Sequence, residues 1–375
     1  MKTALYARLA SRPIPRVTRM MGVARDLGFE CTYIGAQRDN EADTTGEWDG
    51  FPVVRVGTHF PLVNGKRPWT YLTGVARYNR ALFRELRARR PAFVHASDFE
   101  VTPSCCLYKL MYRKPLIYNI HDNLADRYPI PRVLRSVLNA LEGAVVLLSS
   151  RSVVPEEFRR TSLPSWCRAR VSVIRNSPQD MGWVEPKMGE RRIRILYAGW
   201  LDTGRGLSGL LQLAREHDWL EVRIAGEGDQ EIIDEITSAG ATYLGFLGHR
   251  EVMTETGNCD LVAAFYDPVR RINRAAAPNK LAEALSVGRP VLINEEVLVG
   301  QSESLQDCLV RVPYGDLALI SGKIWKIFNE NAGSRFLEMC QAARKAYLLE
   351  YDWLMVREQM ATLHVQLNLS GVERG

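Results

Sequence analysis

The sequence has no apolar run as long as the 18 or so residues that a membrane-spanning helix needs. It has no Asp-x-Asp pair and no group of His, Cys, Asp and Glu at metal-ligand spacing, so neither a metal nor a cofactor is predicted. A Gly-x-Ser-x-Gly elbow is missing, which argues against a serine hydrolase. Zinc-finger, RNP-like and helix-turn-helix signatures are also missing, so no nucleic-acid partner is expected.

Cysteine is scarce, and its distribution predicts no disulfide framework. The seven cysteines are scattered along the chain and odd in number. Cys105 and Cys106 lie in an apolar, helix-like run and are expected in a core. The N-terminus enters a short strand at residues 3–6 rather than an apolar secretory segment. A cytoplasmic location is therefore expected.

Charge is distributed unevenly. Residues 1–185 hold 28 Lys and Arg against 17 Asp and Glu, a net charge of +11. Residues 186–375 hold 21 against 26, a net charge of −5. The basic first half favours an anionic partner such as a membrane surface or a glycolipid. A solvated basic face without a partner explains the same numbers.

Short apolar segments alternate with amphipathic ones in both halves of the chain. This alternation predicts an α/β fold with two parallel, doubly wound sheets, and 375 residues suit two domains better than one. In the first half, strands are expected at 3–7, 30–34, 52–56, 93–96, 115–120, 144–148 and 171–174. Helices are expected at 16–27, 70–89, 132–141 and 156–161, with loops at 37–49 and 59–69.

The second half repeats the pattern after a polar segment, 179–191, that is the expected linker. Its strands are expected at 193–198, 221–225, 242–244, 261–264 and 290–293. Its helices are expected at 207–216, from 230 to 238, and at 316–328, 334–350 and 353–367. The predicted domains are 1–180 with the C-terminal helix 355–375, and 181–354. Ligands of such sheets bind at the carboxyl ends of the strands, which predicts a site in a cleft between the domains.

Residues 276–293 hold the strongest candidate site, a helix start followed by a turn and a buried strand. Pro278 suits the first helical position, and the N–H groups after it lack intrahelical acceptors and favour an anion. Lys280 adds positive charge, and Asn279 and Glu283 share its side of the helix. The helix start suits a diphosphate, and Glu283 suits a ribose diol. A capped surface helix with a Lys280–Glu283 ion pair is the simpler interpretation.

Two glycine-bearing loops follow strands of the second half. In the loop 197–206, Gly199 permits close backbone approach and Arg205 can pair with phosphate oxygens. Gly226 opens the loop 226–229, for which contact with the nucleotide base and a simple tight turn are both open interpretations.

Two polar loops follow strands of the first half. His121 and Asp122 come after the strand 115–120, a position typical of an active-site residue in α/β sheets. A buried structural histidine is the alternative for His121. Asp98 and Glu100 follow the strand 93–96 and suit acceptor hydroxyls, as does Asp122, although Asp98 and Glu100 also suit caps of the next helix.

In order and spacing, these segments resemble a known family. The second half resembles the donor-binding domain of GT-B glycosyltransferases, most closely the retaining family 4, at 197–206, 224–228, 243–245 and 278–290. The first half is similar more loosely at 95–98, 118–122 and 173–177. Tyr351-Asp352-Trp353 resembles the segment that precedes the last helix in members of this family. The resemblance implies two Rossmann-like doubly wound domains facing a cleft, with a C-terminal helix that crosses back to the first domain.

The resemblance also implies roles for individual residues. Glu283 would bind the ribose hydroxyls, Arg205 and Lys280 the diphosphate, and His121 the donor sugar near the reaction centre. The rest of the expected donor-binding set is Gly199, Gly226, Pro278 and Asn279. Two positions depart from the family: Ala275 stands where a second glutamate is frequent, and Trp200 where an arginine is usual.

The implied activity is retaining transfer of a sugar from a nucleoside-diphosphate sugar to an acceptor hydroxyl, without a metal. The β-phosphate oxygen would take the acceptor proton during same-face attack. The expected acceptor is a lipid-linked or growing saccharide of the bacterial envelope or an exopolysaccharide. A sugar-nucleotide epimerase of the same architecture and a non-catalytic nucleotide-sugar-binding protein are the alternatives.

The anionic surface of the cell membrane, at its inner face, is a further expected partner. The first loop and helix suggest it, because arginines alternate there with apolar side chains. An ordinary helix with a buried face is the alternative. The residues concerned are Arg8, Arg12, Arg16 and Arg19, and Leu9, Ile14, Val17 and Met20.

Overall fold

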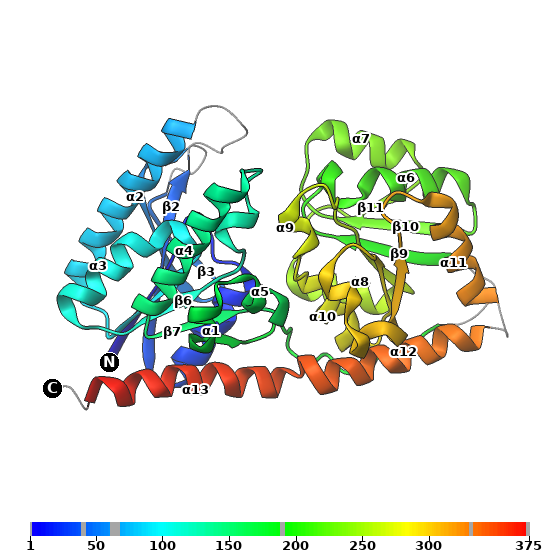
Figure 1. The fold of residues 1–375 in the computed structure, drawn as a ribbon. Helices are drawn as coiled ribbons and strands as arrows, with labels where there is room; N and C mark the ends of the chain where they lie inside the picture. The colour runs from blue at the N-terminus through cyan, green and yellow to red at the C-terminus, as the bar shows by residue number, and fades with distance from the viewer. Residues whose placement is uncertain (1, 39–42, 61–67, 188–191, 330–332, 373–375) are drawn as a thin grey trace. The chain divides into compact units, whose positions relative to one another are not determined.

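The computed structural model describes the chain except for residues 1, 39–42, 61–67, 188–191, 330–332 and 373–375. Its contacts divide the chain into two units (Figure 1). Unit 1 comprises Met1–Arg175 and Val356–Gly375, and unit 2 comprises Asn176–Met355.

Unit 1 is built on a sheet of strand order β3-β4-β2-β1-β5-β6-β7-β8. All its pairings are parallel except that of β3 with β4. The strands are β1 (Lys2–Arg8), β2 (Phe29–Arg38), β3 (Thr45–Trp48), β4 (Phe51–Phe60), β5 (Phe93–Ser97), β6 (Leu116–Asn119), β7 (Arg151–Val154) and β8 (Val171–Val173). The helices are α1 (Pro15–Asp26), α2 (Pro68–Arg89), η1 (Phe99–Val101), α3 (Thr102–Tyr112), η2 (Leu124–Asp126), α4 (Arg132–Leu148), α5 (Glu157–Ser162), η3 (Ser165–Arg170) and α13 (Trp353–Val372).

Both faces of this sheet are buried. Along β1, Leu5 and Ala7 join one core with side chains of α2, α3 and α4. Tyr6 points to the other face, as alternation along a strand requires. Its hydroxyl donates to the Met20 carbonyl of α1 at 3.2 Å and lies 3.1 Å from Nε2 of His364 in α13. The C-terminal helix therefore returns to the first unit, as predicted.

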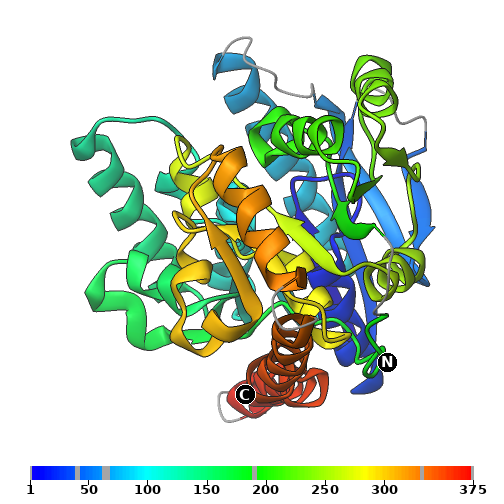
Figure 2. The same ribbon diagram turned by 90° about the vertical axis from the view of Figure 1, so that its right-hand side faces the viewer.

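Unit 2 contains an all-parallel sheet of strand order β11-β10-β9-β12-β13-β14, seen from a second side in Figure 2. The strands are β9 (Ile193–Ala198), β10 (Leu220–Ala225), β11 (Thr242–Tyr243), β12 (Leu261–Ala264), β13 (Val291–Asn294) and β14 (Leu309–Val312). The helices are η4 (Thr203–Arg205), α6 (Leu207–Glu216), α7 (Gln230–Ser238), α8 (His249–Asn258), α9 (Arg271–Arg274), α10 (Asn279–Ser286), η5 (Leu298–Gln301), η6 (Glu303–Cys308), α11 (Leu317–Asn329), α12 (Ser334–Ala346) and the π-helical turn η8 (Tyr347–Tyr351). The prediction of two doubly wound α/β domains is confirmed.

The predicted strand at 144–148 is wrong. Residues 132–148 form one helix, α4, and the strand lies further along, at β7. Val145 and Val146 are buried, whereas Leu147 and Leu148 are exposed, a change of side within four residues that suits a helix. A short apolar run is ambiguous between helix and strand, and here its place at the end of an amphipathic helix decides.

Several predicted loops contain regular structure. Residues 37–49 include the end of β2 and all of β3, and residues 39–42 lie outside the described part of the chain. Residues 59–69 include the end of β4 and the start of α2, and residues 61–67 lie outside it, as do residues 188–191 of the predicted linker. The sequence interpretation also missed α8, α9 and β14.

The first helix does not present the surface that suggested a membrane contact. Arg16, Val17 and Met20 are all buried. Arg16 donates from Nε to Oδ1 of Asn119 at 3.1 Å and from Nη1 to the Ile174 carbonyl at 2.6 Å. The alternative, an ordinary helix with a buried face, is confirmed for these residues.

The cysteines and the long helices agree with what the sequence predicts for disulfides and for membrane-spanning segments. All seven cysteines are buried and free, including Cys105 and Cys106 in α3. Among the described residues, no helix is both long enough and apolar enough to cross a bilayer.

Candidate functional site

In unit 2, the candidate residues gather at the carboxyl edge of the parallel sheet. Gly199 follows β9 and Gly226 follows β10, and these two strands are paired in register. Arg205 ends η4, and Lys280 lies in the first turn of α10. The loops after adjacent parallel strands lie side by side, so residues distant in sequence meet here.

The two glycines let these loops pack backbone to backbone. Gly199 donates from its N–H to the Ala225 carbonyl at 2.9 Å, and Gly226 donates to the Gly245 carbonyl at 2.9 Å. Gly226 has φ of +154°, and a Cβ there would lie 1.9 Å from the Gly199 carbonyl oxygen. No other residue fits this crossing, so a packing requirement by itself explains Gly226.

Lys280 is a buried ammonium that faces an aromatic ring rather than a carboxylate. Its Nζ lies 4.2 Å from the centroid of the Tyr197 ring. Among the described residues it has no ion-pair partner within 4.0 Å. Burial, together with the positive charge of Arg205, lowers the pKa of Lys280 to about 7, although Glu283 opposes the shift. Such a site gains stability when an anion binds.

Arg205 occupies a similar position beside Tyr266. Its guanidinium carbon lies 5.5 Å from the centroid of the Tyr266 ring. Neither cation is neutralised by a carboxylate in the described part of unit 2, and each repels the other. Two neighbouring cations that have no carboxylate within ion-pair distance are the kind of arrangement that suits a polyanion.

The start of α10 is available to an anion. Pro278 is the N-cap, with φ of −71° and ψ of 129°, so the helix begins at Asn279 and not at Pro278 as the sequence predicted. No side chain caps this end. Oδ1 of Asn279 is buried without a hydrogen-bond partner among the described residues. The uncapped helix end therefore adds its own partial positive charge beside Lys280.

Glu283 lies one turn along α10 from Lys280 but does not pair with it. Its carboxylate lies 3.7 Å from Nδ1 of His249, its only ion-pair partner in the described residues. The interpretation of Lys280 and Glu283 as a surface ion pair is wrong, since Lys280 is buried and turned to Tyr197. Glu283 keeps acceptor capacity suited to a diol.

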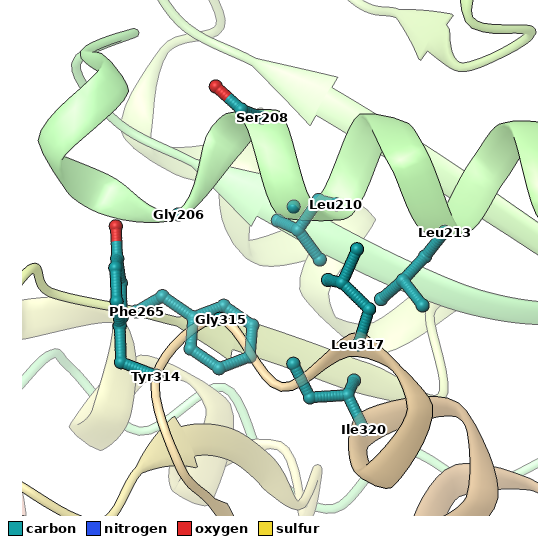
Figure 3. Close-up of a pocket in the computed structure, with 10 residues that line it drawn as sticks. Gly206, Ser208, Leu210, Leu213, Phe265, Tyr314, Gly315, Leu317 and Ile320 are labelled. Carbon is teal, nitrogen blue, oxygen red and sulfur yellow. The ribbon is translucent and has the colours of Figure 1, made fainter.

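A small cavity of about 180 Å³ lies in the same unit, next to Gly206 (Figure 3). Its lining combines Phe265 and Tyr314 with aliphatic side chains of α6 and α11, and no charged side chain lines it. Gly206 has φ of +73°, and a Cβ there would lie 2.4 Å from Cβ of Phe265. An apolar lining does not suit a diphosphate, so this cavity is not a candidate anion site.

In unit 1, Asp98 is the centre of a charged cluster. Its carboxylate accepts from Nε of Arg8 at 3.0 Å and from Nη2 of Arg127 at 2.8 Å. These cations and His121 hold the pKa of Asp98 well below its ordinary value, against the effect of burial. Asp98 has φ of +71° and makes no side-chain cap, so the capping interpretation is wrong.

His121 is held between two side chains at the ends of β5 and β6. Nδ1 lies 3.1 Å from Oδ1 of Asp98, and Nε2 lies 3.3 Å from Nδ2 of Asn119. Oδ1 of Asn119 accepts from Arg16, so Nδ2 donates to Nε2 and Nδ1 carries the proton. Burial lowers the pKa of His121, in agreement with a neutral ring. A general acid or base role would require one of these bonds to break.

The other two carboxylates predicted for the site in unit 1 also have cationic partners. Glu100 accepts from Nη1 of Arg127 at 2.6 Å and from the Tyr71 hydroxyl at 3.0 Å. Asp122 lies 2.9 Å from Nη2 of Arg159 and is about one third exposed. The structure therefore brings Asp98, Glu100 and His121 into one network, whereas Asp122 pairs separately.

Sequence reasoning missed the side chains that position these groups. In unit 2 they are two tyrosines next to strand ends and His249 at the start of α8, and in unit 1 they are two arginines remote in sequence from the acids they bind and Asn119 at the end of β6. Only the tyrosines carry a sequence signal, their place at a strand end beside a glycine loop. The missed residues are Tyr197, Tyr266, His249, Arg8, Arg127 and Asn119.

Among the residues that the structure describes, no cluster of three or more His, Cys, Asp or Glu side chains has the arrangement of a metal site.

Comparison with solved structures gives the fold. Sucrose-phosphate synthase from Thermosynechococcus elongatus is 11% identical, with a TM-score of 0.78 over 99% of this chain and 100% of that one. HepE from Anabaena, in complex with UDP and glucose, is 14% identical, with a TM-score of 0.68 over 97% and 100%. A glycosyltransferase from Rickettsia africae is 11% identical, with a TM-score of 0.67 over 98% of each chain. No curated protein sequence matches the chain.

A family match accompanies this fold. Residues 13–177 match the family described as "Glycosyl transferase 4-like domain", somewhat less than half of the chain. Taken with the two doubly wound sheets, the match agrees with the fold of GT-B glycosyltransferases, to which the solved structures above are similar. The match to the glycosyl transferase 4-like domain falls almost entirely on the first unit. The resemblance to GT-B glycosyltransferases is confirmed.

Proposed function

We propose that the protein transfers a sugar from a nucleoside-diphosphate sugar to an acceptor hydroxyl with retention of configuration. The observation that carries the proposal is the buried Lys280 ammonium, which lies without a carboxylate partner at the uncapped start of α10. In this proposal the domain 181–354 binds the donor, and the domain 1–180, with helix 355–375, binds the acceptor.

Departure of the nucleoside diphosphate is the step that these residues would assist. Negative charge grows on the β-phosphate as the glycosidic bond breaks, and the cations already in place stabilise it without reorganising. Arg205 and Lys280 supply full charges, and the N–H groups after Pro278 supply partial ones. The acceptor attacks from the same face, and its proton passes to a β-phosphate oxygen. Neither a metal nor a protein nucleophile takes part in this scheme.

The proposal also assigns the other contacts of the donor. In it Glu283 accepts from the ribose diol, Asn279 donates its amide to the diphosphate, and Gly199 and Gly226 give the diphosphate room to approach the loops. His121 positions the sugar, with Asp98, Glu100 and Asp122 on the acceptor side. UDP is the first nucleotide to test, since structures of HepE contain UDP and UDP-glucose.

The acceptor in this proposal is a saccharide or glycolipid, lipid-linked or growing, of a bacterial envelope or exopolysaccharide. The protein would act in the cytoplasm, peripherally at the inner face of the membrane. The basic first half of the sequence, with its net charge of +11 over residues 1–185, supports an anionic acceptor or surface.

Donor turnover with and without acceptor tests the proposal. Binding of UDP-, GDP-, ADP- and CDP-sugars is first screened by thermal shift, because a ligand of the folded state raises the melting temperature. Free nucleoside diphosphate should then appear only when a saccharide acceptor is added. An epimerase would convert the donor without acceptor, and a non-catalytic binding protein would show the thermal shift alone.

Donor affinity should weaken as the pH rises above 7. The pKa of Lys280 is about 7 in the free protein, so the binding cation is progressively lost above that pH, by up to about tenfold in affinity per pH unit. UDP-glucose is the suitable ligand, because its diphosphate does not titrate in this range. Calorimetry between pH 6 and pH 9 should also show proton uptake on binding.

Lys280→Arg is the control for this pH profile, since its charge does not titrate there. Its affinity should be independent of pH over the same range. A wild-type profile as flat as that of the variant would contradict the role of Lys280.

A further inference from the structure

Helices α3 and α4 of unit 1 leave an unusual amount of apolar surface exposed. Both helices send their inner side chains into the same core, Cys105 and Tyr108 from α3 and Val145 and Val146 from α4. Their outer faces therefore lie on the same side of the sheet, where Figure 1 shows them. The exposed apolar side chains of this α3–α4 surface are Leu107, Leu110, Met111, Val133, Leu134, Val137, Leu141, Leu147 and Leu148.

The exposed residues follow helical spacing and form continuous stripes. On α3, Leu107, Leu110 and Met111 are separated by three and four positions, and Leu110 is 63% exposed. On α4, Leu134, Val137 and Leu141 repeat the same spacing toward Leu148. Isolated exposed leucines are ordinary, but a contiguous stripe on two adjacent helices indicates a partner.

A tryptophan extends this surface at the far end of α4. Gly143 is buried in the helix, and a Cβ there would lie 2.4 Å from the Trp166 ring. The missing side chain lets the half-exposed Trp166 lie directly against α4. Tryptophan with one apolar side and one wet side is favoured where protein meets the headgroup region of a bilayer.

The charge around the apolar stripes has one sign. Arg113 and Lys114 at the end of α3 and Arg132 at the start of α4 are exposed. The only carboxylate on the two helices, Glu142, is fully buried and accepts from the Tyr118 hydroxyl at 3.0 Å. η3 adds Arg168 and Arg170 without an acid. All the exposed charged side chains of α3 and α4 are therefore cations.

We propose that the α3–α4 surface docks the protein onto an anionic lipid bilayer. The leucines and valines would enter the headgroup boundary while the flanking cations contact lipid phosphates, the combination that holds interfacial helices on membranes. A second copy of the chain fits less well, because it would bring the same cations face to face without a carboxylate to pair with them. The inference concerns a surface remote in sequence from Lys280 and does not depend on the donor chemistry.

Flotation of the full chain with lipid vesicles tests the proposal. Vesicles of phosphatidylcholine are compared with vesicles that also contain phosphatidylglycerol. The wild type should bind the second kind and not the first. L134Q/V137Q should weaken binding about tenfold, and R113Q/K114Q about fivefold for each cation removed. L319Q, at an exposed leucine of α11 in unit 2, is the matched control and should bind as the wild type does.

The outcomes separate three cases. Absence of wild-type binding, equal binding to both kinds of vesicle, or unchanged binding of both double variants would overturn the proposal. A dimer in light scattering that L134Q/V137Q dissociates would overturn it in favour of contact between copies. Nucleotide-sugar binding by the same variants should be unchanged, because all four positions are exposed and outside the donor site. If the wild type itself does not bind a nucleotide sugar, the result counts against the proposed function and not against the membrane surface.

Discussion

Replacing Lys280 with methionine should lower turnover about 100- to 1,000-fold and, in the same protein, raise the melting temperature of the free enzyme. The first effect follows because Lys280 is one of two cations in position to stabilise the leaving diphosphate. The second follows because the folded protein holds this ammonium in a buried site that lowers its pKa to about 7. Methionine keeps the alkyl volume and removes the cost of burying the charge.

A fall in turnover together with a rise in melting temperature would distinguish a lysine that binds an anion from an ordinary structural lysine. Lys280→Arg should recover part of the activity, since the charge returns with a different shape. Lys345→Met, at an exposed lysine of α12, should change neither quantity. Steady-state kinetics and calorimetric unfolding measure the two effects. A loss of stability in Lys280→Met with normal turnover would refute the assignment.

Replacing Asp98 with alanine should destabilise unit 1 by about 3–5 kcal/mol. The substitution leaves the Arg8 and Arg127 guanidinium groups without their shared carboxylate in a largely buried cluster, and an uncompensated buried charge costs this much. Thermal unfolding followed by circular dichroism gives the change. Glu85→Ala, which removes an exposed pair with Arg89 at 2.8 Å, should cost less than about 1 kcal/mol.

The pH dependence of this loss has a definite sign. The pKa of Asp98 lies below its ordinary value of 3.8, so its stabilisation is complete above that pH and is lost as the pH falls through the lowered pKa. The difference between the wild type and Asp98→Asn should therefore narrow below about pH 4. A difference that grows on acidification would show that Asp98 does not stabilise the fold as a carboxylate.

Regular alternation made most of the fold predictable from the sequence. β9, α6 and β12 begin and end where the pattern placed them, because each is a buried or amphipathic segment bounded by glycine or charge. The exceptions share a cause. The run at 144–148 is apolar at five successive positions, so it shows no periodicity that would distinguish a helix from a strand. Packing against the core determines that it is helical.

The candidate site was predictable in its location but not in its electrostatics. The glycines and Lys280 follow from the rule that ligands meet parallel sheets at strand ends. Whether Lys280 pairs with Glu283 depends on side-chain rotamers and burial. In the structure the Lys280 ammonium faces the Tyr197 ring instead. Arg16 likewise reads as a surface cation, yet it is buried by partners 103 and 158 positions away in the sequence.

Because the C-terminal helix packs into unit 1, the two units are expected to complete their folding in a fixed order. Unit 2 is a continuous stretch of chain, whereas unit 1 needs Val356, Met360 and Leu363, which are buried in it and are translated after all of unit 2. During synthesis the first half of the chain therefore keeps the α13 face of its sheet uncovered until α13 has been translated. Nascent chains of this protein should therefore complete their second unit before their first, and a stop codon before residue 356 would damage the half of the protein that was made earliest.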